Sequence, residues 1–347
     1  MTDAPRLLVA DLRAKAPVWR LPESGATRLA AAAPEGWRVH IVNAPTVSDG
    51  DGGTAPSAEA LDAVARAEAY VGFGISRALF AAASRLRWIH SAAAGVGGLL
   101  FPELRDSDVI VTNSAGVHAE PMAEHVLAGV LHLLRGHDLA VEARRRRAWE
   151  RASFVGEGSP VRELSECRAL ILGAGGIGSA IARKLSALGA RCVGVRRRPE
   201  LGAPAGFERV VGATDWEALL PESDILVLSA PSTDATRGLV TGSVLDRLPQ
   251  GAIVVNVARG ALLDEAALVE RLSRGAIRGA VLDVFADEPL PPESALWNFP
   301  SVLITPHVSA VSPRRFWERE LSLVIDDWRR YHAGMPMRNV VDRAAGY

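Results

Sequence analysis

The chain has 347 residues, of which 48% are hydrophobic and 23% charged, with 39 basic residues against 40 acidic ones. This length and composition are typical of a globular protein of two domains. The balanced charge argues against a nucleic-acid-binding protein, which usually carries a strong basic excess. Two cysteines, Cys167 and Cys192, are too few for a disulfide framework or a cysteine-rich zinc site.

No apolar run approaches the roughly 18 residues that a membrane span needs. The first residues also lack the apolar stretch of a secretory signal. We therefore expect a cytoplasmic protein with no bound metal, no nucleic-acid partner and no membrane contact.

The first third of the chain alternates short apolar runs with alanine-rich stretches of helical spacing. Residues 49–56 (DGDGGTAP) have the composition of a turn-rich loop. The alternation predicts a parallel sheet with helices on both faces. Strands are predicted at 6–10, 37–42, 69–72, 87–90 and 109–112, and helices at 24–33, 57–67 and 76–84.

A long helix is predicted next, at 120–135, because apolar residues recur there at helical spacing. The basic run 144–147 is interpreted as a solvent-exposed helix end, and 156–160 as a linker. A second alternating set follows, with one helix that begins after the N-cap Asp264 and ends near Gly275. Its strands are predicted at 168–172, 191–195, 207–211, 225–230, 252–257, 277–284 and 302–305, and a last helix at 315–332.

A glycine-rich segment, GAGGIG at 173–178, joins the strand at 168–172 to a predicted helix at 179–188. In this strand–turn–helix context the pattern GxGxxG indicates a dinucleotide site. Gly173 permits the tight turn, Gly175 lets the backbone approach a pyrophosphate, and Gly178 lets helix and strand pack closely. The helix N-terminus offers free N–H groups and the positive end of its dipole to the phosphates.

Three arginines, Arg196, Arg197 and Arg198, follow the next predicted strand. In a site for NAD an acidic residue at this position binds the ribose 2′-OH. A guanidinium can instead bind a 2′-phosphate through paired hydrogen bonds. A solvated arginine cluster is the alternative interpretation, but the position after this strand favours a role with the cofactor. We expect NADP(H) to be preferred, with NAD(H) possible.

Three later segments each end or follow a predicted strand, where open α/β sheets place their ligands. They are NVARG at 256–260, DVFADEP at 283–289 and TPH at 305–307. Arginine, glutamate and histidine together suit the reduction of a 2-keto acid. A guanidinium can hold the carboxylate and polarise the carbonyl, an imidazolium can protonate the developing alkoxide, and a nearby carboxylate stabilises that imidazolium. Taken singly, each could equally be a surface arginine, a loop glutamate or a capped histidine.

From Trp88 to Tyr347 the chain resembles the D-isomer-specific 2-hydroxyacid dehydrogenase family. The resemblance rests on the glycine-rich segment, on Pro231-Ser232-Thr233 with Thr236-Arg237, and on the three later segments. It implies that Arg259 binds the substrate, that His307 is the acid/base and that Glu288 is its partner. Glutamate at this last position also argues against the formate dehydrogenase branch, which has glutamine there.

The residues expected to contact the cofactor are those of the glycine-rich segment and the three arginines, together with positions that the resemblance implies. Among the latter, Asp283 is expected near the nicotinamide amide. The full set is Gly173, Gly175, Gly176, Ile177, Gly178, Arg196, Arg197, Arg198, Ala230, Pro231, Thr236, Val257, Ala258, Asp283, His307 and Ala310.

Ala94, Gly95 and Val96, within SAAAGVGG, match the family's substrate loop, whose backbone N–H groups hold the substrate carboxylate. Gly97 departs from the family, which commonly has an aspartate there. The implied fold is α/β: a Rossmann-type dinucleotide-binding domain at 116–308 and a discontinuous flavodoxin-like substrate (catalytic) domain at 1–115 and 309–347. The active site would lie between the domains, and domain closure should precede hydride transfer.

The resemblance is greatest to the bacterial NADPH-dependent glyoxylate/hydroxypyruvate reductases, through the three arginines and the ending at 340–347. It implies reduction of a glyoxylate-like or hydroxypyruvate-like 2-keto acid to a D-2-hydroxy acid. A homodimer is expected, with the helix at 120–135 in the contact. Trp149 stands where some glyoxylate reductases place a tryptophan near the partner's site, although a tryptophan that packs within its own chain is the alternative.

Two other functions stay open. One is an NAD-dependent dehydrogenase of another acid, such as phosphoglycerate or phosphite, which would need further cations, for example Arg77 and Arg20. The other is a dinucleotide-sensing corepressor, which would bind the cofactor tightly, turn over poorly and recognise a partner protein.

Overall fold

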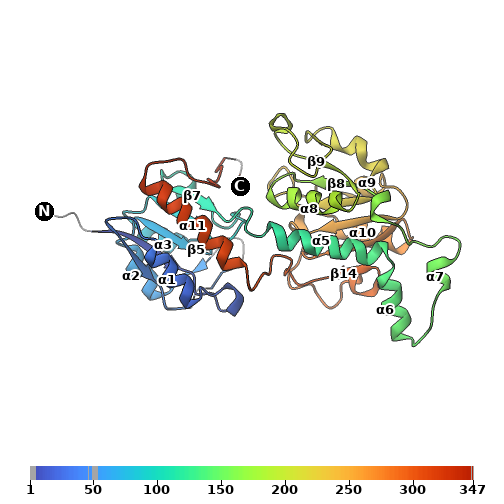
Figure 1. Ribbon diagram of the computed structural model, residues 1–347, viewed down its shortest axis with the longest axis horizontal. Coiled ribbons are helices and arrows are strands. Elements are labelled where there is room, and N and C mark those ends of the chain that lie inside the picture. The colour runs from blue at the N-terminus through green and yellow to red at the C-terminus, as the bar shows by residue number, and fades with distance from the viewer. Residues whose placement is uncertain (1–4, 46, 49–53, 345, 347) are drawn as a thin grey trace. The chain divides into compact units, whose positions relative to one another are not determined.

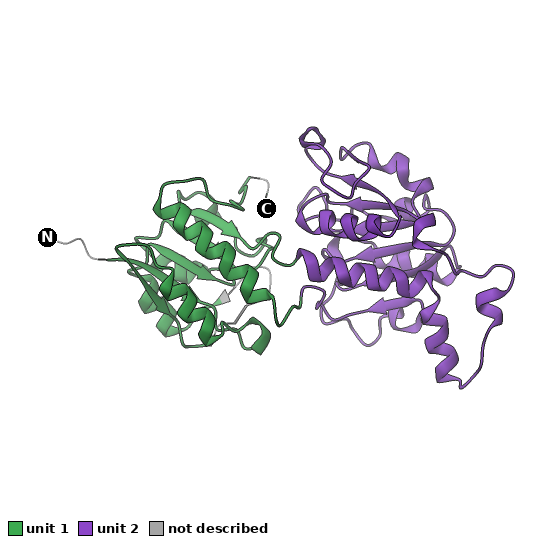
Figure 2. Cartoon of the chain, in the orientation of Figure 1, with its two compact units in different colours: residues 1–118, 311–347 green, residues 119–310 purple. Residues whose placement is uncertain are grey.

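The computed structural model describes residues 5–45, 47–48, 54–344 and 346. The chain forms two compact units, coloured separately in Figure 2. Unit 1 contains residues up to 118 and from 311 onward, and unit 2 contains residues 119–310. Over the described part of the chain, no helix has both the length and the apolar composition that crossing a membrane would require.

Unit 1 is built on a parallel five-stranded sheet with the order β2-β1-β5-β6-β7, the order of flavodoxin-like folds. A short antiparallel pair, β3 and β4, stands apart from this sheet. The strands are β1 (Arg6–Asp11), β2 (Trp37–Ile41), β3 (Val47–Ser48), β4 (Thr54–Ala55), β5 (Ala69–Gly72), β6 (Trp88–Ser91) and β7 (Ile110–Asn113). The helices are α1 (Glu23–Ala31), α2 (Ala58–Val64), α3 (Arg77–Ala82), α4 (Pro102–Arg105) and α11 (Phe316–His332), with a 3₁₀ turn at Pro17–Trp19.

Both faces of the unit 1 sheet are buried. Alternate residues along the strands, such as Ile89 and Trp88, point into two separate hydrophobic clusters. The first cluster includes residues of α2 and α3, and the second includes residues of α1 and α11. The last long helix of the chain therefore completes the core of a sheet made by the first 113 residues (Figure 1).

Unit 2 is built on a parallel seven-stranded sheet with the order β10-β9-β8-β11-β12-β13-β14. This order reverses between β8 and β11, and open α/β sheets bind their ligands at such a point. The strands are β8 (Arg168–Leu172), β9 (Arg191–Val195), β10 (Arg209–Val211), β11 (Ile225–Leu228), β12 (Ala252–Asn256), β13 (Ile277–Leu282) and β14 (Val302–Ile304). The α-helices are α5 (Ala119–Leu134), α6 (His137–Arg145), α7 (Ala152–Val155), α8 (Gly176–Ala187), α9 (Gly242–Leu245) and α10 (Glu265–Ser273). Short 3₁₀ helices occur at Leu164–Glu166, Pro199–Leu201, Trp216–Glu222, Gly260–Leu262 and Ala295–Asn298.

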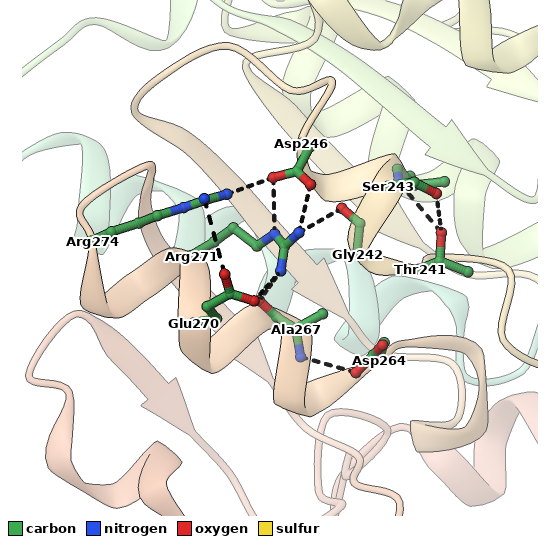
Figure 3. A network of polar contacts seen from close by, with 10 residues as sticks. Thr241, Gly242, Ser243, Asp246, Asp264, Ala267, Glu270, Arg271 and Arg274 are labelled. Carbon is green, nitrogen blue, oxygen red and sulfur yellow. Dashed lines mark hydrogen bonds and ion pairs between the residues drawn. The ribbon is translucent and has the colours of Figure 1, made fainter.

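Helices α5 and α8 cover one face of this sheet, and α9 and α10 contribute to the hydrophobic cluster on the other. A polar network joins α9 to α10 (Figure 3). Arg271, which is only 7% exposed, donates to Asp246 at 2.6 and 3.2 Å and to the Gly242 oxygen at 3.1 Å. Arg274 also donates to Asp246, and the pKa of Asp246 is lowered chiefly by its hydrogen bonds to these arginines. The network fixes the pairing of the two helices.

The predicted α/β class with two parallel sheets is confirmed. Some boundaries were wrong. The strand predicted at 225–230 ends at Leu228. Ser229 still donates its N–H to the Leu172 oxygen at 2.9 Å, and its hydroxyl donates to the Gly173 oxygen at 3.0 Å. The loop predicted at 49–56 contains β4, while 49–53 lie outside the described residues. Helix α6 was not predicted. It begins after Gly136, whose φ of 67° is left-handed and separates it from α5.

Candidate active site

The glycine-rich segment lies at the carboxyl end of β8 and leads into α8. Gly173 has a φ of 112°, and a Cβ there would lie 2.7 Å from the Ala230 nitrogen. A Cβ on Gly178 would lie 1.9 Å from the Gly173 oxygen. Nothing lies within 4 Å of the Cβ position of Gly175. Packing therefore explains the first and third glycines, whereas Gly175 leaves open space before the helix N-terminus, which fits the close approach of a pyrophosphate.

The three arginines emerge beside this segment. The N–H groups of Gly173 and Ala174 both donate to the Val195 oxygen, at 3.0 and 2.9 Å, so the end of β9 is tied to the glycine-rich turn. Arg196 donates to the Gly202 oxygen at 3.3 Å, and Arg197 and Arg198 are exposed. The three arginines therefore directly follow the strand end that is bonded to the glycine-rich turn.

The remaining predicted cofactor positions border the same sheet edge. Thr236 orders the loop after β11, since its hydroxyl donates to the Pro231 oxygen at 2.6 Å and accepts the Thr233 N–H at 2.8 Å. Ala230 follows β11 and is half-buried. The others are Gly176 and Ile177 in the first turn of α8, the buried Val257 and Ala258 after β12, and Ala310 at the end of unit 2.

His307 and Glu288 form a pair. The Nδ1 atom of His307 lies 2.8 Å from the Oε2 atom of Glu288. The other carboxylate oxygen of Glu288 accepts the N–H of Phe285 at 3.0 Å, which holds the carboxylate in place. The His307 side chain is 46% exposed, so its ring is accessible from solvent. Such a pair can hold an imidazole in one orientation and stabilise its protonated form.

Asp283 anchors the loop that carries His307. It is fully buried and accepts the N–H groups of Val308 and Ser309, each at 2.9 Å, and the hydroxyl of Thr305 at 2.6 Å. His307 itself has a φ of 54°, a conformation that is uncommon for a residue other than glycine. These bonds on both sides of His307 hold the strained residue in position. The anchoring role was not predicted from the sequence, although Asp283 and Thr305 both stood inside recognised motifs.

Arg259 follows β12 and is half-buried. The buried Asn256 accepts the Ala258 N–H and donates to the Arg259 oxygen, both at 3.0 Å, so it shapes the turn that presents the guanidinium. A Cβ on Gly260 would lie 1.9 Å from the carbonyl carbon of Phe285, so only glycine lets this turn pack against the loop that carries Glu288. The structure therefore brings Arg259, Glu288 and His307 to the ends of three neighbouring strands, β12, β13 and β14.

A further acidic residue holds the loop that carries Glu288. Glu265, at the start of α10, accepts the N–H of Ala286 at 2.6 Å, two residues before Glu288. Burial raises the pKa of Glu265, and the negative charges of Asp287 and Glu288 add to the rise. Glu265 has no signal of its own in the sequence, because its role is a hydrogen bond to a backbone group 21 residues further along the chain. Asn256 stands inside the NVARG segment, but its bonds to the backbone of that segment were not predicted.

The loop after β6 in unit 1 presents bare backbone N–H groups. No described residue accepts a hydrogen bond from the N–H of Ala94, Gly95 or Val96. Consecutive free N–H groups in a loop form a concavity suited to an anion such as a carboxylate. The loop that was predicted to bind the substrate therefore contains three consecutive residues whose N–H groups have no acceptor among the described residues.

The other residues that the sequence singled out lie in varied surroundings. Arg144 and Arg145 end α6 and, with Arg146 and Arg147, are exposed, as predicted. Trp149 is 94% exposed and lies outside any helix, so the interpretation that it packs within its own chain is wrong. Arg77 lies 3.6 Å from Glu103, and Arg20 donates to the backbone oxygens of Ala14 and Lys15.

Comparison with known proteins gives consistent results. A profile of the NAD binding domain of D-isomer specific 2-hydroxyacid dehydrogenases matches residues 127–309. Glyoxylate/hydroxypyruvate reductase A of Salmonella newport (strain SL254) is 33% identical over 277 residues, which cover 77% of this chain and 83% of that protein.

Solved structures resemble the chain along nearly its whole length. A D-isomer specific 2-hydroxyacid dehydrogenase from Xanthobacter autotrophicus Py2, in complex with NADPH and MES, is 31% identical with a TM-score of 0.80, over 99% of this chain and 100% of that chain. The NADPH-dependent glyoxylate/hydroxypyruvate reductase from Sinorhizobium meliloti, in complex with NADP and sulfate, is 28% identical with a TM-score of 0.77, again over 99% and 100%.

Proposed function

Because this chain belongs to the D-isomer specific 2-hydroxyacid dehydrogenase family and is an NAD(P)-dependent oxidoreductase, we propose that it reduces a 2-keto acid, of the glyoxylate or hydroxypyruvate type, to a D-2-hydroxy acid with NADPH. The observation that carries this proposal is the His307–Glu288 pair, 2.8 Å apart, on the same sheet edge as Arg259 and the glycine-rich segment. That set supplies an acid, its partner, a carboxylate receptor and a dinucleotide site.

The two units contribute different groups in this proposal. Unit 1 binds the substrate carboxylate through the N–H groups of Ala94, Gly95 and Val96, and unit 2 binds the cofactor. Arg259 of unit 2 binds the carboxylate and polarises the carbonyl, because a guanidinium can donate two parallel hydrogen bonds.

The proton moves through His307. When bound, the nicotinamide would supply a hydride to C2 of the acid, so that negative charge would develop on the carbonyl oxygen. The imidazolium of His307 donates its Nε2 proton to that oxygen. Glu288 accepts the Nδ1–H, which fixes the ring and stabilises its charged form before the transfer. The hydrogen bonds of Asp283 hold the ring at the required place.

The preference for NADPH rests on Arg196, Arg197 and Arg198, which stand where a family member selective for NAD has an acid. The relatives from Xanthobacter autotrophicus Py2 and Sinorhizobium meliloti, solved with NADPH or NADP, support the same preference. We also propose a homodimer that involves α5 and the segment around Trp149, because that segment exposes two large apolar side chains, Trp149 at 94% and Val155 at 71%.

The test is the loss of nicotinamide absorbance with purified protein and NADPH or NADH, against glyoxylate, hydroxypyruvate, pyruvate, phenylpyruvate and oxaloacetate. We expect turnover with NADPH well above that with NADH, and highest for one of the first two acids. Equal or faster turnover with NADH would reject the role of the arginines. Tight NADPH binding without turnover of any acid would reject the reductase and favour a dinucleotide sensor.

A further inference from the structure

Asn113 is a buried polar residue at the carboxyl end of β7, only 6% exposed, to which the reaction described above assigns no role. Its side-chain nitrogen donates to the backbone oxygen of Ala94 at 2.8 Å. Its side-chain oxygen accepts the N–H of Ala115 at 3.2 Å. One amide therefore joins the loop after β6 to the segment in which the chain leaves unit 1.

The bond to Ala94 has a consequence for the next residue. The oxygen of Ala94 and the N–H of Gly95 belong to one planar trans peptide unit and point in opposite directions. A donor that holds this oxygen on one side therefore directs the Gly95 N–H to the other side. That N–H lies in the middle of the three free backbone N–H groups of Ala94, Gly95 and Val96.

Other contacts hold the two ends of the loop. At its far end the Val96 oxygen accepts the N–H groups of Leu99 and Leu100, at 3.1 and 3.2 Å. The hydroxyl of Ser114 donates to the Ser91 oxygen at 3.0 Å, and the N–H of Ser114 donates to the Ala93 oxygen at 3.4 Å. The hydroxyl of Ser91 accepts the Ala93 N–H at 3.3 Å. Within the described part of the chain, Asn113 is the one side chain that bonds to the backbone of residues 94–96.

We propose that Asn113 is a positioning residue for the substrate: it holds the Ala94–Gly95 peptide in the orientation in which the N–H groups of Ala94 to Val96 bind a carboxylate. This inference rests on the proposed function, which gives that loop its ligand. A fixed array of N–H groups binds an anion more tightly than a mobile one, since no ordering cost arises on binding. Loss of the bond should therefore weaken binding of the acid and leave binding of the dinucleotide unchanged.

Asn339 provides a matched control. Its side chain donates to the oxygens of Asn113 and Ala115, at 3.2 and 2.8 Å, so it braces the same strand end without bonding to the loop. Its φ is 48°, a conformation that glycine adopts readily. Asn339→Gly therefore removes a brace of similar size and leaves the Asn113–Ala94 bond in place.

The experiment compares Asn113→Ala, Asn113→Asp and Asn339→Gly with the wild-type enzyme. Aspartate keeps the acceptor for Ala115 but cannot donate to the Ala94 oxygen when ionised. We expect both Asn113 variants to raise the KM of the 2-keto acid and the inhibition constant of oxamate, a non-reducible analogue, by about tenfold, the value of one hydrogen bond. We expect kcat and the Kd of NADPH to stay within about twofold, and Asn339→Gly to leave all four constants unchanged.

An unchanged KM in both Asn113 variants, or an equal rise in Asn339→Gly, would overturn the inference while the proposed function stood. If the wild-type protein reduces no acid, the proposed function fails instead. The crystal structure of Asn113→Ala then decides: a reoriented Ala94–Gly95 peptide supports the positioning role, and an unchanged peptide overturns it.

Discussion

The candidate functional groups are side chains at the sheet of unit 2 and backbone N–H groups at the sheet of unit 1. At the carboxyl edge of the unit 2 sheet, long charged side chains such as Arg196, Arg259 and His307 follow the strands. At the corresponding edge of unit 1, the loop after β6 offers small residues and bare N–H groups. The ionisable pair of β6 and α11 is buried instead: His90 Nε2 lies 3.1 Å from Glu320 Oε1, and both side chains are fully buried.

This difference explains why residue types singled out the groups of unit 2, whereas the loop of unit 1 was singled out only through its resemblance to the family's substrate loop. Side-chain chemistry needs particular residue types, so unit 2 has recognisable motifs. Backbone chemistry needs only a conformation, and the side chains that hold that conformation, such as Asn113, lie elsewhere in the chain. The following predictions test this division between a side-chain edge and a backbone edge.

The largest effect should come from His307. We expect His307→Ala to lower kcat by about 10²–10⁴-fold, because the alkoxide loses its proton donor, with the Kd of NADPH changed less than twofold. Steady-state kinetics and fluorescence titration measure the two quantities. His137→Ala, at an exposed position on α6, is the control and should behave as wild type. A kcat within about tenfold of wild type in His307→Ala would remove the acid role from this residue.

The next effect concerns the choice of cofactor. The double variant Arg196→Asp/Arg197→Ser removes two guanidinium groups. It should lower the ratio of kcat/KM for NADPH to kcat/KM for NADH by about 10–100-fold, because charge-assisted hydrogen bonds to the 2′-phosphate are lost. The same change of charge in Arg144→Asp with Arg145→Ser, at the end of α6, should leave the ratio as it is. An unaltered ratio in the first variant would mean that other groups bind the 2′-phosphate.

A smaller effect separates two glycines of one segment. Gly175→Ala should weaken NADPH binding by about tenfold, because the added Cβ would occupy space that the pyrophosphate needs. The free energy of unfolding should not change, because the Cβ meets no atom of the described residues within 4 Å. Gly178→Ala should instead destabilise unit 2 by about 1–3 kcal/mol, because its Cβ would overlap the Gly173 oxygen. Cofactor titration and urea unfolding of both variants test this assignment, and it would be refuted if Gly175→Ala lost stability and kept its NADPH affinity.

The smallest effect is a pH dependence within unit 1. Burial raises the pKa of Glu68, but hydrogen bonds from Arg6 and Tyr331 outweigh it and hold this pKa below its usual range. A lowered folded-state pKa stabilises the fold above about pH 4.3, the ordinary glutamate value, and this contribution is lost as the pH falls through the folded-state pKa.

Glu68→Gln should therefore cost about 1–2 kcal/mol of unfolding free energy at pH 7, with the difference from wild type shrinking below about pH 4. Urea unfolding at both pH values measures it. Glu103→Gln, which removes the exposed partner of Arg77, should have no measurable effect. A difference for Glu68→Gln that is constant with pH would show that the carboxylate charge is not what stabilises the cluster.

The sequence alone predicted which residues after the strands of unit 2 are functional. It did not predict the residues that hold them in position. The glycine-rich segment was singled out by its spacing after an apolar strand. Arg259, Glu288 and His307 were singled out because the three residue types together suit the reduction of a 2-keto acid and because their segments resemble those of the family. Asn256, Glu265 and the anchoring by Asp283 required coordinates, since each acts through a hydrogen bond to a backbone group. Helix α6 was not predicted as a separate helix, because a helix that begins directly after a glycine has no distinct pattern. For Trp149 the sequence left two interpretations open, because its exposure depends on packing.

The most direct test of the central claim is the identity and handedness of the product. Wild-type protein is incubated with hydroxypyruvate and NADPH, and the glycerate formed is resolved by chiral chromatography. We expect one equivalent of D-glycerate for each NADPH consumed. L-glycerate, or no glycerate from protein that binds NADPH, would contradict it.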